Sequence, residues 1–154
     1  MQLEHLWDWR RSHTCGELRA DAAGTSVRLA GWVHRTRDHG GVLFLDLRDR
    51  HGLIQIVFRP ESVSETVLEK ARSLRSEFVV AVDGEVSLRP DTMRNPNLPT
   101  GDLEVLAREV RILNDAQTPP FQVEDETSAS EDLRLEYRYL DLRRPDLAKV
   151  IGLR

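Results

Sequence analysis

Three runs of β-forming residues follow one another between positions 26 and 58, and a glycine-containing turn separates each run from the next. The first turn carries Gly40 and Gly41, and glycine readily adopts the positive φ angles that a tight turn between antiparallel strands requires. Pro60 ends the third run because proline has no backbone N–H to donate to a sheet. The pattern therefore predicts an antiparallel meander with strands over 26–37, 42–48 and 53–58.

A helix is predicted next, over residues 62–74, where apolar side chains recur at helical spacing. Ser62 or Ser64 can cap its free N–H groups. Two more strands are predicted after the helix, over 78–86 and 103–113.

Gly84 interrupts the fourth strand and indicates a bulge or bend, which allows a small sheet to curl. Three prolines in 89–101 predict a loop before the last strand. The order of three strands, one helix and two strands matches the five-stranded Greek-key barrel called the OB-fold, although another small barrel has a similar pattern. The predicted fold class is therefore mainly β, with one helix between the third and fourth strands.

Both flanks of the barrel carry helical signals. Thr14 and Glu17 have the spacing of a capping box, which predicts a short helix near 14–20. Prolines followed by acidic residues predict a linker over 115–130. A C-terminal helical extension is predicted over 131–154, where the pattern stops without a terminating signal and suggests truncation. The barrel domain is thus predicted to occupy 1–114, with the barrel itself at about 26–113.

Composition excludes several classes of protein. No run approaches the ~18 to 20 apolar residues of a membrane span, so no membrane partner is expected. The single cysteine, Cys15, excludes an intramolecular disulfide and is typical of a cytoplasmic protein. The histidines lack metal-ligand spacing, and neither a phosphate loop nor a Ser-His-Asp arrangement is present. We therefore predict no metal, no cofactor and no catalytic residue in this chain.

The net charge of -4 argues against indiscriminate coating of nucleic acid, but the first half of the barrel is locally basic. Guanidinium groups suit contacts to phosphates and to base edges because their donors form a planar, permanently charged fork. The arginines gathered in the first three strands and their turns are Arg28, Arg35, Arg37, Arg48, Arg50 and Arg59.

Strand alternation singles out two side chains for nucleic-acid contact. In the second strand the leucines share one face, so Phe44 is predicted on the outer face, where an exposed ring can stack on an unpaired base. In the third strand the same reasoning places Gln55 on the more polar face, where its amide can bond to a base edge. Two other interpretations stay open: Phe44 as core covered by the N-terminal helix, and Gln55 and Arg37 as ordinary solvated residues.

Several longer runs of the sequence carry a family resemblance, at 31–41, 44–49, 52–55, 74–78, 100–105, 118–121 and 133–144. Together they resemble the N-terminal domain of bacterial aspartyl-tRNA synthetases, and the similarity spans nearly the whole chain beyond residue 13. The last run is shared in part with lysyl and asparaginyl relatives, and its combination with the first points to the aspartate enzyme.

The resemblance implies that the barrel binds the anticodon loop of aspartate tRNA, whose bases are G or queuosine, then U, then C. Phe44 matches the aromatic residue that stacks on the central uridine, and Gln55 matches the amide that reads a base edge beside it. Arg37 matches a cation near the third base, and Glu104 matches the carboxylate associated with the first base.

The remaining implied contacts lie in loops. Arg89 and Asn95 belong to the loop that closes over the anticodon in this family. His39 occupies a position associated with tolerance for asparagine tRNA, which would make the enzyme non-discriminating. Thr36 stands where the family usually has arginine, which removes one cation beside the phosphates.

The resemblance also implies what surrounds this domain. Residues 136–144 lie at the junction with a class II catalytic domain, which binds ATP and Mg²⁺ and forms aspartyl-adenylate, and the full-length enzyme is a homodimer. The three class-defining motifs lie beyond Arg154, so this chain is expected to bind tRNA without charging it.

Two other functions fit an isolated barrel of this kind. A module that binds single-stranded nucleic acid without sequence preference would bind unrelated oligonucleotides equally well. A protein-interaction domain would not depend on Phe44 for any binding to tRNA.

Overall fold

The computed structural model describes residues 3–6, 8–125 and 127–153, so any expectation for Met1, Gln2, Trp7, Glu126 or Arg154 lies outside the described residues. The chain divides into two compact units, at 1–116 and 117–154. Each unit is described by itself.

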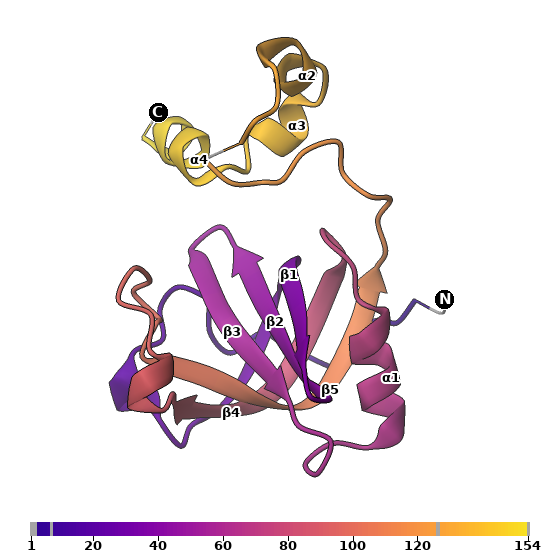
Figure 1. Ribbon diagram of the computed structural model, residues 1–154, viewed down its shortest axis with the longest axis vertical. Helices are drawn as coiled ribbons and strands as arrows, with labels where there is room; N and C mark the ends of the chain where they lie inside the picture. Colours follow the sequence, from indigo (N-terminus) through magenta and orange to yellow (C-terminus); the bar gives the residue numbers. More distant parts are fainter. Residues whose placement is uncertain (1–2, 7, 126, 154) are drawn as a thin grey trace. The chain divides into compact units, whose positions relative to one another are not determined.

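Five strands of the first unit form a closed barrel in the order β1-β2-β3-β5-β4, which Figure 1 shows as a single curled sheet. All neighbours are antiparallel except β3 and β5, which run parallel. This topology confirms the predicted mainly β, five-stranded Greek-key barrel. The strands are β1 (Ser26–His39), β2 (Val42–Asp49), β3 (Gly52–Phe58), β4 (Val79–Leu88) and β5 (Leu103–Asn114).

The barrel interior is filled by the side chains that alternation predicted. Leu43, Leu45 and Leu47 of β2 are all buried in one hydrophobic cluster, which also contains Ile54 and Ile56 of β3. Residues two apart on a strand point to the same face, so the residues between these positions lie on the outer face of the barrel.

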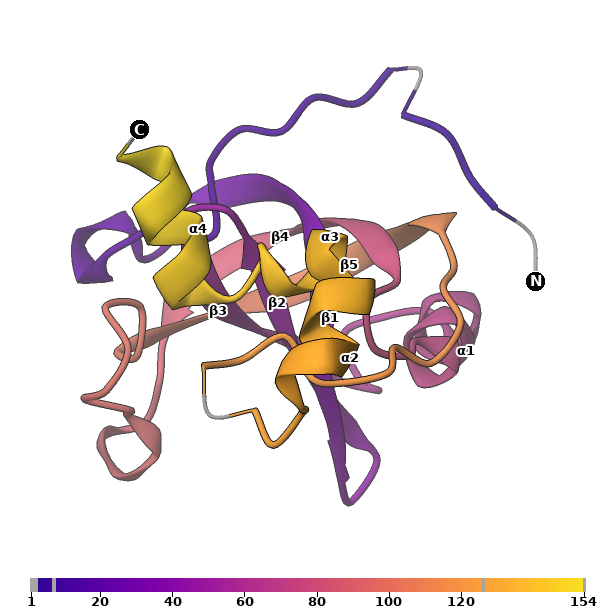
Figure 2. The same cartoon turned by 90° about the horizontal axis from the view of Figure 1, so that it is seen from above.

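The predicted helix between the third and fourth strands is α1 (Glu65–Ser73). The Ser64 hydroxyl accepts a hydrogen bond from the Val67 N–H at 3.3 Å, which caps the first turn. Val67, Leu68 and Ala71 face the core, and the helix packs beside β5 (Figures 1 and 2).

A bulge bends the sheet at the predicted glycine. The pairing of β4 with β5 shifts between Asp83 and Gly84, which leaves Arg108 as the extra residue on β5. A Cβ atom at position 84 would lie 2.5 Å from the Leu106 carbonyl oxygen, so only glycine allows the two strands to approach this closely.

The N-terminal segment differs from its prediction. The Glu17 carboxylate does accept a hydrogen bond from the Thr14 N–H, as a capping box requires, but the segment forms a turn instead of a helix over 14–20. Cys15 donates its N–H to Asp49 Oδ2 at 2.8 Å, and Gly16 packs directly against the His51 carbonyl. These contacts to the barrel fix the backbone, and the one helical turn, η1, follows at Ala20–Ala22 as a 3-10 helix.

Residues 3–6 and 8–13 lie outside the barrel, as Figure 2 shows in indigo. The Glu4 N–H donates to the Ile112 carbonyl at 2.7 Å, and the Ser12 N–H donates to the Arg28 carbonyl at 2.9 Å. The segment is therefore tied to both β5 and β1.

The second unit contains three short helices, α2 (Glu131–Glu136), α3 (Arg138–Asp141) and α4 (Pro145–Gly152). Ser130 caps α2 by accepting the Leu133 N–H at 3.2 Å. Phe121 and Val123, from the segment predicted as a linker, pack with Leu140 in a small separate core. Within the described part of the chain, every helix is too short or too polar to cross a membrane.

Candidate nucleic-acid interface

The outer face of the barrel carries two neighbouring rows of side chains across its strands. The first row contains Arg37, Phe44, Val57 and Leu106, and the second contains Arg35, Asp46 and Gln55, which Glu104 and Ser87 continue on β5 and β4. Cross-strand neighbours on one face have Cβ atoms about 4.5–5.5 Å apart, so these side chains can interact directly. The strand register thus brings four of the predicted site residues together.

Phe44 is partly exposed on this face and lies outside the hydrophobic cluster that fills the barrel. The Arg37 guanidinium lies 5.7 Å from the centre of its ring, and the His39 ring meets it edge-on with centroids 5.6 Å apart. A cation near an aromatic face and a second ring at its edge both hold the ring in place. The interpretation of Phe44 as core beneath an N-terminal helix is therefore wrong.

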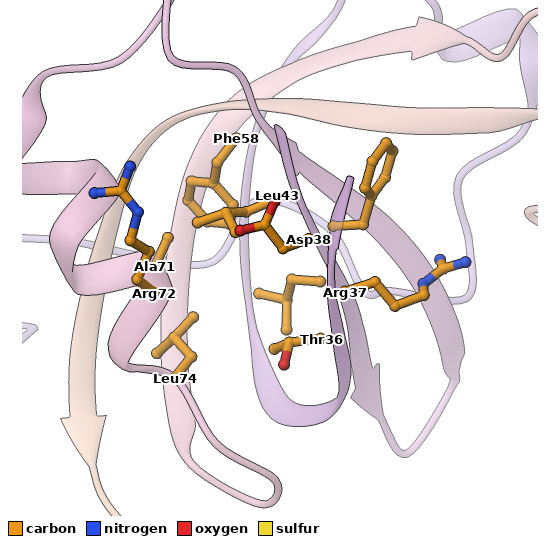
Figure 3. Close-up of a pocket in the computed structure, with 10 residues that line it drawn as sticks. Thr36, Arg37, Asp38, Leu43, Phe58, Ala71, Arg72 and Leu74 are labelled. Carbon is orange, nitrogen blue, oxygen red and sulfur yellow. The ribbon is translucent and has the colours of Figure 1, made fainter. Parts of the chain in front are cut away.

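A pocket of 270 Å³ lies between the β1–β2 hairpin and α1, as Figure 3 shows. Leu43, Phe58 and Leu74 line it together with hairpin residues that include Thr36, Arg37, Asp38 and Phe44. Apolar and charged side chains both line this pocket, and two of them, Arg37 and Phe44, also belong to the outer face.

Gln55 is 7% exposed and is fixed by two hydrogen bonds. Its Oε1 accepts from Arg37 Nη2 at 3.2 Å, and its Nε2 donates to Glu104 Oε2 at 3.0 Å. Its position on the outer face agrees with alternation, but the interpretation as an ordinary solvated residue is wrong. Since an amide has four hydrogen-bonding positions, two remain for a ligand.

Glu104 is 5% exposed, and its carboxylate lies beside Gln55 in the second row, which we call the polar row. Besides the bond from Gln55, its Oε1 lies 3.8 Å from Arg59 Nη2. An ionised carboxylate can only accept hydrogen bonds, so this position favours a ligand that presents N–H groups. Glu104 therefore adds an acceptor to a face that otherwise offers mainly donors.

Arg89 is buried at the base of the loop between β4 and β5. Its Nε donates to the Leu103 carbonyl at 2.8 Å and its Nη1 to the Met93 carbonyl at 3.5 Å. Burial lowers the pKa of Arg89, and the negative charges of Glu104 and Asp46 oppose that effect. Arg89 thus supports the loop and acts on the polar row through its charge.

Asn95 belongs to the same loop, but its hydrogen bonds stay within it. Its N–H donates to the Gly101 carbonyl at 3.0 Å, and its Oδ1 accepts the Asn97 N–H at 3.0 Å. A Cβ atom at Gly101 would collide with the Asn95 carbonyl, so the loop is closely packed. The structure therefore brings Asn95 near its loop partners and not into the network of Gln55 and Glu104.

The arginines in the first three strands differ in how accessible their side chains are to a ligand. Arg48 is 5% exposed, and its Nη2 lies 2.5 Å from Glu77 Oε1 while its Nη1 lies 2.9 Å from His34 Nδ1. Burial and the nearby Arg48 charge lower the pKa of His34. Arg37 and Arg59, whose side chains are 44% and 46% exposed, remain accessible to a ligand.

Two residues of this face were not predicted as site residues. Asp46 Oδ1 lies 3.7 Å from Arg37 Nη2, and Arg59 pairs with Glu104 as described above. Strand alternation could have found both, because Asp46 is two residues from Phe44 and Arg59 is two residues beyond Val57. Among the described residues, no group of three or more His, Cys, Asp and Glu side chains could hold a metal ion.

A five-stranded Greek-key barrel with a partly exposed ring, a fixed amide and solvent-accessible guanidinium groups on one face has the features of an oligonucleotide-binding domain. The model of the OB-fold nucleic acid binding domain family matches residues 27–113, which is more than half of the chain. The chain belongs to this family.

Its relatives narrow the family further. The chain is 59% identical over 152 residues to Aspartate–tRNA(Asp/Asn) ligase of Oleidesulfovibrio alaskensis and 57% identical over 149 residues to that of Desulfatibacillum aliphaticivorans. These matches cover 99% and 97% of the chain but only 25% of each relative, so the chain spans about a quarter of their length.

A solved structure agrees with the sequence relatives. Asparaginyl-tRNA synthetase from Pyrococcus horikoshii, complexed with asparaginyl-adenylate, superimposes with a TM-score of 0.78 at 31% sequence identity. The match covers 93% of this chain and 31% of that structure. The chain is therefore homologous to part of a larger aminoacyl-tRNA synthetase.

Proposed function

We propose that this chain recognises the anticodon of aspartate tRNA, as the tRNA-binding part of an aspartate–tRNA ligase that also accepts asparagine tRNA. The observation that carries the proposal is the partly exposed ring of Phe44, held on the outer face by Arg37 and His39. The choice of aspartate and asparagine tRNA as substrates follows the name of the relatives, Aspartate–tRNA(Asp/Asn) ligase.

In this proposal Phe44 stacks on the central uridine of the anticodon. Stacking of a base on an aromatic side chain stabilises a complex by ~1–3 kcal/mol, and the contact requires that the ring has one open face. Gln55, beside it, offers its two unused hydrogen-bonding positions to a base edge. Stacking supplies affinity, and the amide adds discrimination between bases.

The other polar side chains contact the flanking bases. Arg37 lies near the third base, and Glu104 accepts hydrogen bonds from the first. Arg89 and Asn95 shape the loop that closes over the anticodon, and His39 lies where tolerance for asparagine tRNA is set. The common network of Arg37, Gln55 and Glu104 supports the first two roles, and the hydrogen bonds of Arg89 and Asn95 within their loop support the third.

The whole ligase attaches aspartate to tRNA with ATP and Mg²⁺, and acts as a homodimer in the cytoplasm. This chain would supply the anticodon-binding domain at 1–114, a linker at 115–130 and the start of the hinge and class II catalytic domain at 131–154. The chain matches only about a quarter of the length of each ligase, which supports the assignment of these parts to this chain and of the remaining catalytic domain to the rest of the ligase.

Binding of RNA hairpins to the 154-residue chain tests the proposal. The hairpin with the aspartate anticodon GUC should bind more tightly than one whose middle base is changed, and Phe44→Ala should weaken binding of the GUC hairpin by about 1–3 kcal/mol. Tyr139→Ala, which removes a 63% exposed ring from the second unit, is the matched control and should leave binding unchanged.

The alternatives make opposite predictions in the same assay. Equal affinity for both hairpins would indicate a nucleic-acid-binding module without sequence preference. If Phe44→Ala binds the GUC hairpin as tightly as the unaltered chain, the Phe44 ring does not contact the RNA. That result would favour a protein-interaction domain.

A further inference from the structure

The polar network on the outer face ends at an arginine whose role is still open. Glu104 Oε2 is held by Gln55, while Glu104 Oε1 lies 3.8 Å from Arg59 Nη2. The Glu104 side chain is 6% exposed and that of Arg59 is 46% exposed. The pair therefore joins a buried carboxylate to a cation at the surface.

The sequence places Arg59 at this position. Arg59 directly follows β3, and alternation puts it on the same face as Gln55 and Val57. Pro60 then ends the sheet, and the Arg59 carbonyl accepts hydrogen bonds from the Ser62 N–H at 2.9 Å and the Val63 N–H at 3.2 Å. The backbone of Arg59 is thus anchored in a turn while its guanidinium reaches back over the sheet.

The distance between Arg59 Nη2 and Glu104 Oε1 determines whether the carboxylate can still accept hydrogen bonds from a ligand. A distance of 3.8 Å is an ion pair without a good hydrogen bond, so it attracts Oε1 without using its lone pairs. With Gln55 on Oε2 and Arg59 beside Oε1, the carboxylate has a fixed orientation and still accepts further hydrogen bonds. Within the described residues, Arg59 is the one cation at ion-pair distance from Glu104.

We propose that Arg59 is a positioning residue, which holds Glu104 so that its carboxylate accepts paired N–H donors from a guanine. This inference rests on the proposed function, in which Glu104 reads the first base of the anticodon. Guanine presents an imino and an amino N–H side by side on its Watson–Crick edge, whereas inosine lacks the amino group. A correctly oriented carboxylate distinguishes these two bases, and a rotated carboxylate does not.

Hairpins with guanine or inosine as the first anticodon base test this role. A hydrogen bond to a charged group corresponds to roughly a tenfold or larger preference, so the unaltered chain should prefer guanine by at least about tenfold. Arg59→Ala should reduce that preference below about threefold, and Arg59→Lys, which keeps the charge, should restore part of it.

Arg28→Ala is the matched control. The Arg28 side chain is 47% exposed and also pairs with a carboxylate, that of Asp83, but it lies nine residues before Arg37 on β1, roughly 30 Å along the strand. Removing either arginine should weaken both hairpins through lost charge, with a smaller salt dependence. Only Arg59→Ala should change the ratio between guanine and inosine.

The outcomes separate this role from the proposed function. Equal weakening of both hairpins by Arg59→Ala, with the tenfold preference intact, would show that Arg59 contributes charge alone and would overturn the proposal. An unaltered chain that selects the middle base but not guanine over inosine would also overturn it, while leaving anticodon binding in place. Failure to select the middle base would instead refute the proposed function.

Thermal unfolding of Arg59→Ala is the control for folding. A melting temperature near that of the unaltered chain shows that the altered ratio comes from a folded barrel.

Discussion

Replacement of the buried Glu77 by alanine should strongly destabilise the barrel. The Arg48–Glu77 pair is separated by 2.5 Å, and the two side chains are only 7% and 6% exposed. Without the carboxylate, Arg48 becomes a buried charge without its anionic partner, which typically costs 3–5 kcal/mol. For a unit of this size, the loss corresponds to a fall in melting temperature of more than about 10 °C.

The backbone at Glu77 provides an internal control. Its φ angle is +67°, in the left-handed region that costs a non-glycine residue roughly 1–2 kcal/mol. Glu77→Gly removes the same carboxylate but relieves this strain, so it should be less destabilising than Glu77→Ala by about 1 kcal/mol. Glu77→Gln retains a polar partner for Arg48 and should lie between the unaltered chain and Glu77→Ala.

Chemical denaturation followed by tryptophan fluorescence measures these free energies of unfolding. A loss below about 1 kcal/mol in Glu77→Ala would show that the pair behaves as an exposed salt bridge, and the reasoning from burial would be refuted. Equal free energies of unfolding for Glu77→Ala and Glu77→Gly would show that the positive φ angle at position 77 does not strain the alanine variant.

Two further changes test the same barrel. Because burial lowers the pKa of His34 below its ordinary 6.5, unfolded His34 binds a proton before folded His34 does, so the free energy of unfolding should fall as the pH drops below about 6.5. His34→Gln should reduce that acid-side slope in denaturation series, and an unchanged slope would contradict the assignment. Gly84→Ala places a Cβ atom 2.5 Å from the Leu106 carbonyl and should destabilise the barrel by about 1–3 kcal/mol, measurable in the same assay. Full stability of this variant would mean that the bulge tolerates a side chain.

Local pattern was enough to predict the barrel and the outward position of Phe44. Alternation in β2 depends only on residues two apart, so burial of Leu43, Leu45 and Leu47 follows directly from the sequence. The cap at Ser64 is equally local. In contrast, the helix predicted near 14–20 is overridden by contacts with the turn between β2 and β3.

The polar network required knowledge that sequence spacing does not contain. The Gln55–Glu104 hydrogen bond joins residues 49 positions apart and depends on the parallel pairing of β3 with β5. The Arg48–Glu77 pair likewise connects β2 to the segment after α1, and it removes one arginine from the predicted basic face. Resemblance to a family suggested Glu104, but only the fold shows how its two oxygens are held.

The most direct test of the account is an NMR measurement on the chain bound to the GUC hairpin. If Phe44 stacks on the central uridine, its ring protons should shift on binding and give intermolecular NOEs to the protons of that base. Phe44 signals that stay at their free positions while another surface of the barrel responds would contradict the proposed mode of recognition.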